Sequence, residues 1–257
     1  MKRIRMHLLN WGQWRTFENA AGVIFLSQTS RRVYENARGT VEGCTAIIPH
    51  GISTAFDQEP TTAHPIDDFR RGNPFRWLYV SPIRLYKHQW HVVQAVEALR
   101  KEGFPIALDL VGSPNPRAIE KLRDTLREVD PDEEYVRYHG RVPYREVNDL
   151  YQRSDAFVFA STCEAFGQVL TEAMQAGLPI ACSNQSAAPE VVQDAGVYFD
   201  PEQPDEIAEA MRMLMEDELL RSEKARTGYQ RAQDFSWDRC ARETFSFITK
   251  VARSSDR

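Results

Sequence analysis

Residues 157–182 read FVFASTCEAFGQVLTEAMQAGLPIAC, and this stretch decides the fold class. An apolar run ends at Ala160, a polar turn follows it, and a helical pattern begins near Phe166. We expect the helix to stop where Gly177 supplies a C-terminal cap ahead of Pro179, where a second apolar run begins. The stretch therefore predicts strand, turn, helix and strand, which is the repeating unit of a parallel α/β sheet.

The same alternation extends outward along the chain from Gly22. Continuous apolar runs are typical of strands covered on both faces, and helical patterns lie between them. The class is therefore α/β with a doubly wound parallel sheet, followed by a tail over 202–253 that we predict to be wholly helical. The expected strands are 22–26, 44–48, 77–81, 106–111, 136–139, 156–160, 180–182 and 197–199.

One stretch, 53–73, breaks this rhythm. It contains Pro60 and Pro65 and has no apolar period, so we interpret it as a connection between domains. About six strand-and-helix repeats follow it, whereas only about two strands precede it. The predicted parts are a remnant of a first domain at 1–52, a linker at 53–73, one complete domain at 74–235, and a final helix and tail at 236–257.

The charge and the cysteine content argue against two classes of function, nucleic-acid binding and zinc binding. The net charge of -5 argues against a partner with a phosphate backbone, so we expect no nucleic acid. The cysteines are far apart and show no CxxC spacing, which favours reduced thiols in a cytoplasmic protein and predicts no zinc site. They are Cys44, Cys163, Cys182 and Cys240.

The sequence predicts neither a membrane span nor a signal peptide. No run approaches the roughly 20 apolar residues that a transmembrane helix needs. The basic start at 1–9 is not followed by a long apolar core. Basic residues beside Trp11, Trp14 and Phe17 have two interpretations. We favour packing of these aromatics on a neighbouring domain, and peripheral contact with a membrane surface is the alternative.

The helix that begins near Phe166 starts at the carboxyl end of a strand, where open α/β sheets bind ligands. Free N–H groups at such a helix start attract an anion such as a diphosphate. Glu164 lies in the turn, and Glu172 lies about two helical turns later. We expect these carboxylates to reach different parts of one extended ligand. Taken alone, the spacing fits two solvated surface glutamates equally well.

Glu164 and Glu172 also reproduce the E-x7-E motif of retaining glycosyltransferases with the two-domain GT-B fold. The surrounding sequence resembles family 4 of these enzymes, the glycosyl transferases group 1, and the resemblance covers nearly all of 22–251. The segments that carry it are 49–52, 110–112, 139–142, 154–161, 172–174, 177–180, 188–192 and 195–199.

The resemblance implies the Rossmann-like C-terminal domain of a GT-B enzyme, which transfers a sugar from a nucleotide-diphosphate sugar to an acceptor hydroxyl with retention of the anomeric configuration. It implies that Glu172 holds the ribose hydroxyls and that Glu164, the expected catalytic residue, lies against the transferred sugar. The fold is metal-independent, so no cofactor is expected. Two backbone segments are implied to approach the donor: Phe166, Gly167, Gln168, Val169 and Leu170 at the sugar and diphosphate, and Gly140, Arg141 and Val142 at the base.

Lys87 matches the family lysine that contacts the donor phosphates, where a cation offsets leaving-group charge. An exposed lysine that opens a helix is the alternative. The family usually places an arginine five or six positions earlier, but this chain has Ser81 and Pro82 there. Arg84 is a candidate replacement, and a solvated loop arginine is the competing interpretation.

Three histidines and a serine are expected to be structural. We expect His50 to shape a turn, His88 and His91 to be packed or exposed rather than ligands, and Ser236 to cap the final helix. In relatives, a helix at this point crosses back to brace the first domain.

The resemblance implies that family members begin with a full domain that binds the acceptor, and we expect residues 1–52 to be only the end of such a domain. Two hypotheses follow. In the first, the chain is an enzyme or enzyme subunit whose acceptor domain comes from a separate polypeptide. In the second, it is a non-catalytic sugar-nucleotide-binding or interaction module, or a truncated relic. The donor sugar, the base and the acceptor stay open.

Overall fold

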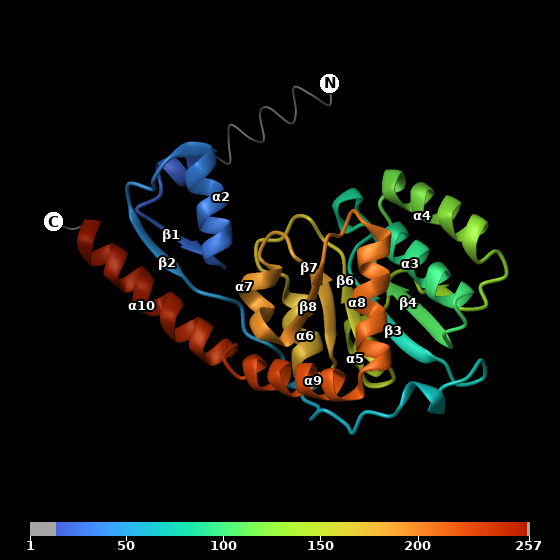
Figure 1. The fold of residues 1–257 in the computed structure, drawn as a ribbon. Helices are drawn as coiled ribbons and strands as arrows, with labels where there is room; N and C mark the ends of the chain where they lie inside the picture. The colour runs from blue at the N-terminus through green and yellow to red at the C-terminus, as the bar shows by residue number, and fades with distance from the viewer. Residues whose placement is uncertain (1–13, 256–257) are drawn as a thin grey trace.

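Six parallel strands form the larger of two sheets (Figure 1). The computed structural model describes residues 14–255, and in it the strand order is β5-β4-β3-β6-β7-β8. The strands are β3 (Phe75–Val80), β4 (Ile106–Val111), β5 (Val136–Tyr138), β6 (Ala156–Phe159), β7 (Ile180–Ser183) and β8 (Gly196–Phe199). From β3 the chain moves outward to β4 and β5 and then returns to β6 on the other side of β3. The strand order therefore reverses between β3 and β6.

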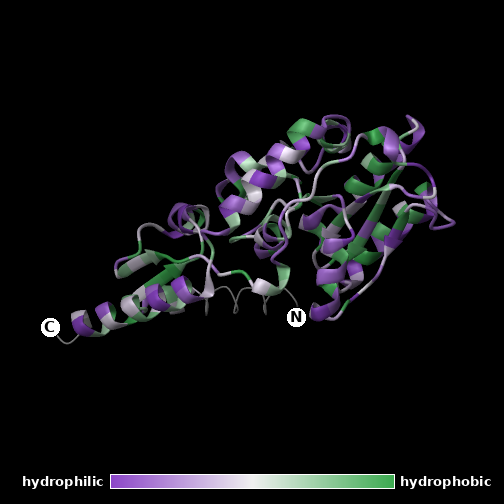
Figure 2. Cartoon of the chain, turned by 90° about the horizontal axis from the view of Figure 1, so that it is seen from below, coloured by the Kyte–Doolittle hydropathy of each residue, from purple (hydrophilic) through white to green (hydrophobic). Residues whose placement is uncertain are grey.

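Apolar strands and amphipathic helices build the core around this sheet. Trp77, Phe157 and Phe159 are fully buried, as expected for strands covered on both faces. Helix α3 packs against α4 and α8, and α6 packs against α7 and α9. Figure 2 shows the strands as hydrophobic and the outer helices as mixed. The helices of this part are α3 (Gln89–Lys101), α4 (Pro116–Val129), α5 (Tyr144–Gln152), α6 (Gln168–Gln175), α7 (Ala188–Val192), α8 (Pro204–Glu216) and α9 (Glu218–Ala232).

The predicted parallel α/β class is confirmed, and all eight expected strands form within two residues of their expected ends. One helix boundary differs from its prediction. Helix α6 begins at Gln168 rather than near Phe166, because Gly167 adopts a left-handed φ of 85°. The predicted helical tail is confirmed, and it is divided into separate helices. Asp217 separates α8 from α9, and its carboxylate accepts a hydrogen bond from the backbone N–H of Leu220 at 2.9 Å.

The second sheet contains β1 (Gly22–Phe25) and β2 (Cys44–Ile47), which pair in parallel, with α2 (Gln28–Arg38) between them in the chain. The six-stranded sheet and helices α3 to α9 are called the larger domain below. Helix α10 (Trp237–Ser255) leaves the larger domain and runs beside the second sheet (Figure 1). As expected, Ser236 caps α10, since its hydroxyl accepts a hydrogen bond from the N–H of Arg239 at 3.1 Å. The division at 52, 73 and 235 stays a prediction.

The aromatics near the start of the described chain pack inward. The ring of Phe17 lies 4.8 Å from that of Tyr34 and 6.4 Å from that of Phe25, and Trp14 lies 5.5 Å from Tyr34. Trp11 lies outside the described residues. Within 14–255, no helix is long and apolar enough to span a bilayer. All four cysteines are free thiols.

The predicted linker at 53–73 is packed rather than loose. It contains the short turns η1 (Thr54–Phe56) and η2 (Ile66–Asp68). Phe56 is 1% exposed and belongs to the core of the larger domain. The guanidinium of Arg221 donates hydrogen bonds to the carbonyl of His64 in the linker and to two carbonyls at the end of α8. The linker is therefore fixed along the helices of the larger domain.

Gly112 follows β4 and allows the ends of β3 and β4 to approach. Its φ is 151°, and a Cβ there would lie 1.9 Å from the carbonyl oxygen of Ser81. We expect Gly112→Ala to lower the free energy of unfolding by about 2 kcal/mol or more, measured by urea denaturation. Gly72→Ala is the control, because a Cβ at Gly72 meets nothing within 4 Å. Equal stability of the two variants would contradict this prediction.

Candidate functional site

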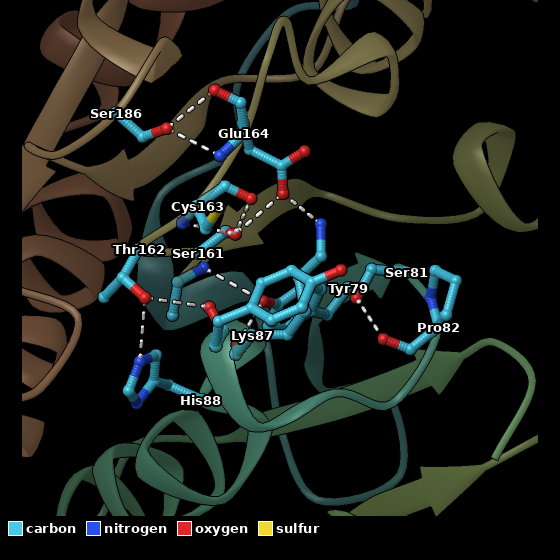
Figure 3. A network of polar contacts seen from close by, with 12 residues as sticks. Tyr79, Ser81, Pro82, Lys87, His88, Ser161, Thr162, Cys163, Glu164 and Ser186 are labelled. Atoms are coloured by element: carbon cyan, nitrogen blue, oxygen red, sulfur yellow. Dashed lines mark hydrogen bonds and ion pairs between the residues drawn. The ribbon is translucent and has the colours of Figure 1, made fainter. Parts of the chain in front are cut away.

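The candidate site lies where β3 and β6 end, at the reversal of strand order. Ligands bind outside the carboxyl ends of open α/β sheets at such points. The loop after β3 carries Lys87, in the short turn η3 (Leu85–Lys87), and the loop after β6 carries Glu164. Figure 3 shows that these two side chains point toward each other from their separate loops. The fold thus brings together two residues that are 77 positions apart.

Lys87 is buried, so the interpretation as an exposed lysine opening a helix is wrong. Only 6% of the residue is exposed, and its ammonium pairs with Oε1 of Glu164. The ammonium also lies 4.5 Å from the centroid of the Phe159 ring. The hydroxyl of Tyr79 donates a hydrogen bond to the Lys87 carbonyl, which fixes the backbone. Burial lowers the pKa of Lys87, and the nearby Glu164 carboxylate opposes this shift.

Glu164 is held at both its side chain and its backbone. Its Oε1 accepts a hydrogen bond from the Ser161 hydroxyl at 2.7 Å, in addition to the Lys87 contact. The Ser186 hydroxyl accepts from the Glu164 N–H at 2.6 Å and donates to its carbonyl at 2.7 Å (Figure 3). Sequence reasoning missed Ser186, because no local pattern joins the loop after β7 to the loop after β6.

The start of α6 presents backbone donors next to Glu164. Gly167 is the N-cap residue, and no side chain caps this helix. The N–H groups of the first turn, which begins at Gln168 and Val169, therefore remain suited to binding an anion. Phe166 and Leu170 are buried side chains of the core, so a ligand here would contact their backbone. The main-chain role predicted for residues 166–170 stays a prediction.

Glu172 lies in the second half of α6 and is only 6% exposed, so the interpretation as a solvated surface glutamate is wrong for it. The hydroxyl of Tyr151 donates to Oε2 at 3.3 Å, and that of Tyr144 donates to Oε1 at 3.5 Å. Phe56 packs edge-on against both tyrosine rings. Burial raises the pKa of Glu172 to about 7, and the two tyrosine hydrogen bonds oppose this shift.

Sequence reasoning missed this tyrosine pair. Tyr144 and Tyr151 both lie on α5 and are seven positions apart, a spacing that places them on one face of a helix. This spacing is the feature of the sequence from which the tyrosine pair could have been predicted. The partners of Glu172 and those of Glu164 are different residues. The two carboxylates therefore have separate environments, as the expectation of two different ligand contacts requires.

The loop after β5 contains Gly140, Arg141 and Val142. Gly140 has a left-handed φ of 67°, and its carbonyl accepts a hydrogen bond from the Gly112 N–H at 2.8 Å. The Arg141 side chain is exposed, and within the described part of the chain it makes no ion pair or hydrogen bond. Just before the loop, His139 pairs with Asp109, a buried residue of β4 that the sequence analysis did not single out.

Ser81 and Pro82 stand where the family usually has a second phosphate-binding cation, an arginine. The Ser81 hydroxyl accepts a hydrogen bond from the Gln89 side chain at 2.9 Å, so it is engaged within the fold. Arg84 is partly exposed, and its side chain makes no hydrogen bond or ion pair among residues 14–255. Its position on the loop that ends at Lys87 leaves it available to an anion.

The three histidines that the sequence singles out are packed, which was one of the two expectations for His88 and His91, and the turn-shaping role of His50 stays a prediction. His50 stacks on Trp237 with ring centroids 5.6 Å apart. His88 is buried with a left-handed φ of 48°, and Nδ1 of His91 lies 2.9 Å from the carbonyl of Pro201. Residues 14–255 contain no group of three or more His, Cys, Asp or Glu side chains that could hold a metal ion. The expectation that no metal is needed stays a prediction.

Comparison with known proteins identifies the family of this chain. The family model described as glycosyl transferases group 1 matches residues 64–232. The chain belongs to this family. O-antigen chain mannosyltransferase B of Escherichia coli is 37% identical over 114 residues, which is 44% of this chain and 30% of that protein. An uncharacterized glycosyltransferase of Methanocaldococcus jannaschii is 31% identical over 249 residues, which is 92% of this chain and 61% of that protein.

Solved glycosyltransferase structures share the GT-B fold. Sucrose-phosphate synthase from Thermosynechococcus elongatus superposes with a TM-score of 0.78 at 22% identity, covering 93% of this chain and 60% of that one. Anabaena HepE, in complex with UDP and glucose, superposes with a TM-score of 0.77 at 22% identity, covering 90% of this chain and 64% of that one. At these identities the likeness shows the fold alone. The chain spans less than two thirds of the length of each of these proteins.

Proposed function

We propose that this glycosyltransferase chain is the donor-binding part of a retaining enzyme. The observation that carries the proposal is the ion pair of buried Lys87 with partly buried Glu164, beside the uncapped start of α6. Together they place a cation, a carboxylate and free backbone donors at one point, and these are the groups that bind a sugar diphosphate. The E-x7-E motif supports the retaining class.

Each proposed contact has a chemical reason. The diphosphate carries two negative charges close to the reacting carbon, and Lys87 together with the α6 N–H groups neutralises the charge that grows on it as the glycosidic bond breaks. Glu164, released from Lys87 as the phosphate takes over the ammonium, contacts the transferred sugar. Glu172 accepts hydrogen bonds from the ribose hydroxyls. No metal or cofactor is required, because this chain supplies the neutralising charge.

Two further contacts complete the donor site. The loop of Gly140, Arg141 and Val142 contacts the base, and the exposed guanidinium of Arg141 has no competing partner within the described residues. Arg84 supplies a second cation at the phosphates, in place of the arginine that the family usually carries. The four free thiols support a reducing, cytoplasmic compartment.

The acceptor is bound by a domain from another polypeptide segment or a separate chain. Phe245 and Ile248 of α10 are 71% and 53% exposed, and Val33 of α2 is 64% exposed. These exposed apolar side chains lie on the two helices that contact β1 of the small sheet, which supports a protein partner there. The alternative is a non-catalytic sugar-nucleotide-binding or interaction module, or a truncated relic. Ser81 and Pro82, in place of the usual arginine, favour this alternative.

Titration calorimetry with GDP-, UDP-, dTDP- and ADP-sugars tests the donor site. We expect saturable binding of one nucleotide class, with a dissociation constant between about 1 μM and 1 mM, the range of typical enzyme KM values. Lys101→Ala is a control that removes an exposed lysine paired with Glu97, and it should bind equally well. A folded chain that binds none of these sugars would contradict the proposal. Binding without transfer, even with a partner domain present, would favour the module.

A further inference from the structure

The carboxylate of Glu190 joins helix α2 to the larger domain. Glu190, on α7, lies at the N-terminus of α2, although the two are 162 residues apart in the sequence. Its Oε1 accepts a hydrogen bond from the N–H of Gln28 at 2.7 Å. Its Oε2 accepts from the N–H and from the hydroxyl of Thr29, both at 2.8 Å. These three bonds cross between the two parts of the chain.

The N-terminus of α2 favours an acidic partner from elsewhere. The helix has 11 residues and no acidic residue in its first turn. Ser27 and Ser30 form a capping box that satisfies two of its backbone N–H groups. The N–H groups of Gln28 and Thr29 remain, and Glu190 accepts both. Charge-assisted bonds of this length at the positive end of a helix are among the stronger hydrogen bonds in proteins.

A second contact leads from α2 to the donor site. The Ser27 hydroxyl donates a hydrogen bond to the carbonyl of Ala165 at 2.6 Å, and Ser27 is only 2% exposed. Ala165 follows Glu164, whose own N–H and carbonyl are both bonded to Ser186. Residues 27–29 therefore hold the larger domain at two points. One of them is the loop that carries the proposed catalytic carboxylate.

We propose that Glu190 is a positioning residue that fixes α2 on the larger domain and, through the Ser27 contact with Ala165, holds the Glu164 loop in its donor-binding geometry. The inference rests on the proposed function, because it assigns the donor site a support outside its own contacts. Through this link, the docking of the small sheet and α2 is coupled to donor affinity. A coupling of this kind typically changes affinity by about 5-fold to 150-fold.

Hydrogen exchange of the full chain without ligand tests the link first. In Glu190→Gln, the bidentate, charged acceptor is lost. We expect faster exchange both in α2 and in residues 161–170, including the Glu164 N–H that is bonded to Ser186. Glu35→Gln is the matched control, because it removes an ion pair with Arg31 within the same helix. If α2 exchanges faster while 161–170 is unchanged, Glu190 only caps the helix and the inference is wrong.

Donor affinity provides the second readout. We expect the dissociation constant of the nucleotide sugar that binds the wild-type chain to rise about tenfold in Glu190→Gln. Ser27→Ala, which breaks the link to Ala165 but leaves Glu190 bonded to α2, should reproduce most of this loss and covers the case in which Glu190→Gln does not fold. Unchanged affinity in both folded variants would overturn the inference. Failure of the wild-type chain to bind any nucleotide sugar would overturn the proposed function, and the exchange result would still decide the link.

Discussion

Glu172→Gln is expected to make the fold more stable above pH 7 and at the same time to weaken donor binding. Burial raises the pKa of Glu172 from its ordinary value of 4.5 to about 7. Between these values the unfolded chain has released this proton while the folded chain keeps it. Stability therefore falls as pH rises from 4.5 to 7, and above pH 7 the whole cost, on the order of 3 kcal/mol, is present. A neutral glutamine removes this cost.

The loss of binding has a different origin. An ionised carboxylate accepts hydrogen bonds from two neighbouring ribose hydroxyls, whereas glutamine offers one acceptor oxygen. Hydrogen bonds to charged groups contribute about 1.5–3 kcal/mol, so we expect affinity to fall at least tenfold. In the wild-type chain, affinity should also rise between pH 6 and pH 8 as Glu172 ionises. Urea denaturation and calorimetry at pH 6, 7 and 8 measure both effects.

Glu120→Gln is the matched control, because Glu120 is an exposed residue of α4. It should leave stability and donor affinity near their wild-type values at every pH. A Glu172→Gln variant that is less stable than wild type at pH 8 would contradict the stability argument. Wild-type affinity in that variant would remove Glu172 from the donor site.

The two glutamates also mark the limit of what the sequence predicts. The E-x7-E spacing located both carboxylates and the helix between them. It carried no information on their surroundings, which come from distant segments. Phe56 arrives from the linker and the tyrosines from α5, so a solvated and a buried Glu172 were equally compatible with the sequence.

The fold was more predictable, because its signals are local. A strand buried on both faces must be continuously apolar, as β6 is, and each of the eight predicted runs contains a strand, although β1 and β2 of the small sheet are only partly buried. The error at α6 occurred where one residue overrides a pattern, because the left-handed Gly167 delays the start of the helix. Ser186 and Glu190 were missed as site residues because their partners lie 22 and 162 residues away.

Lys87→Met is the second large effect that we expect. Methionine keeps an unbranched side chain of similar length but removes the ammonium, and Glu164 is then left partly buried with Ser161 as its remaining side-chain donor. Breaking one half of a buried ion pair destabilises a protein by about 3–5 kcal/mol, and we expect the lower end because Glu164 is not fully buried. Donor affinity should fall about a hundredfold with the loss of the phosphate contact, measured by calorimetry.

The double variant Lys87→Met/Glu164→Gln separates the two roles of this pair. It leaves no unpaired charge, so we expect it to recover most of the stability that the single variant loses. Donor affinity should stay low, because the cation that meets the diphosphate is still absent. Lys101→Met is the control, because Lys101 is an exposed lysine that pairs with Glu97. This substitution should change neither stability nor donor affinity. If the double variant regained donor affinity together with stability, Lys87 would be a structural partner of Glu164 and not a ligand of the phosphates.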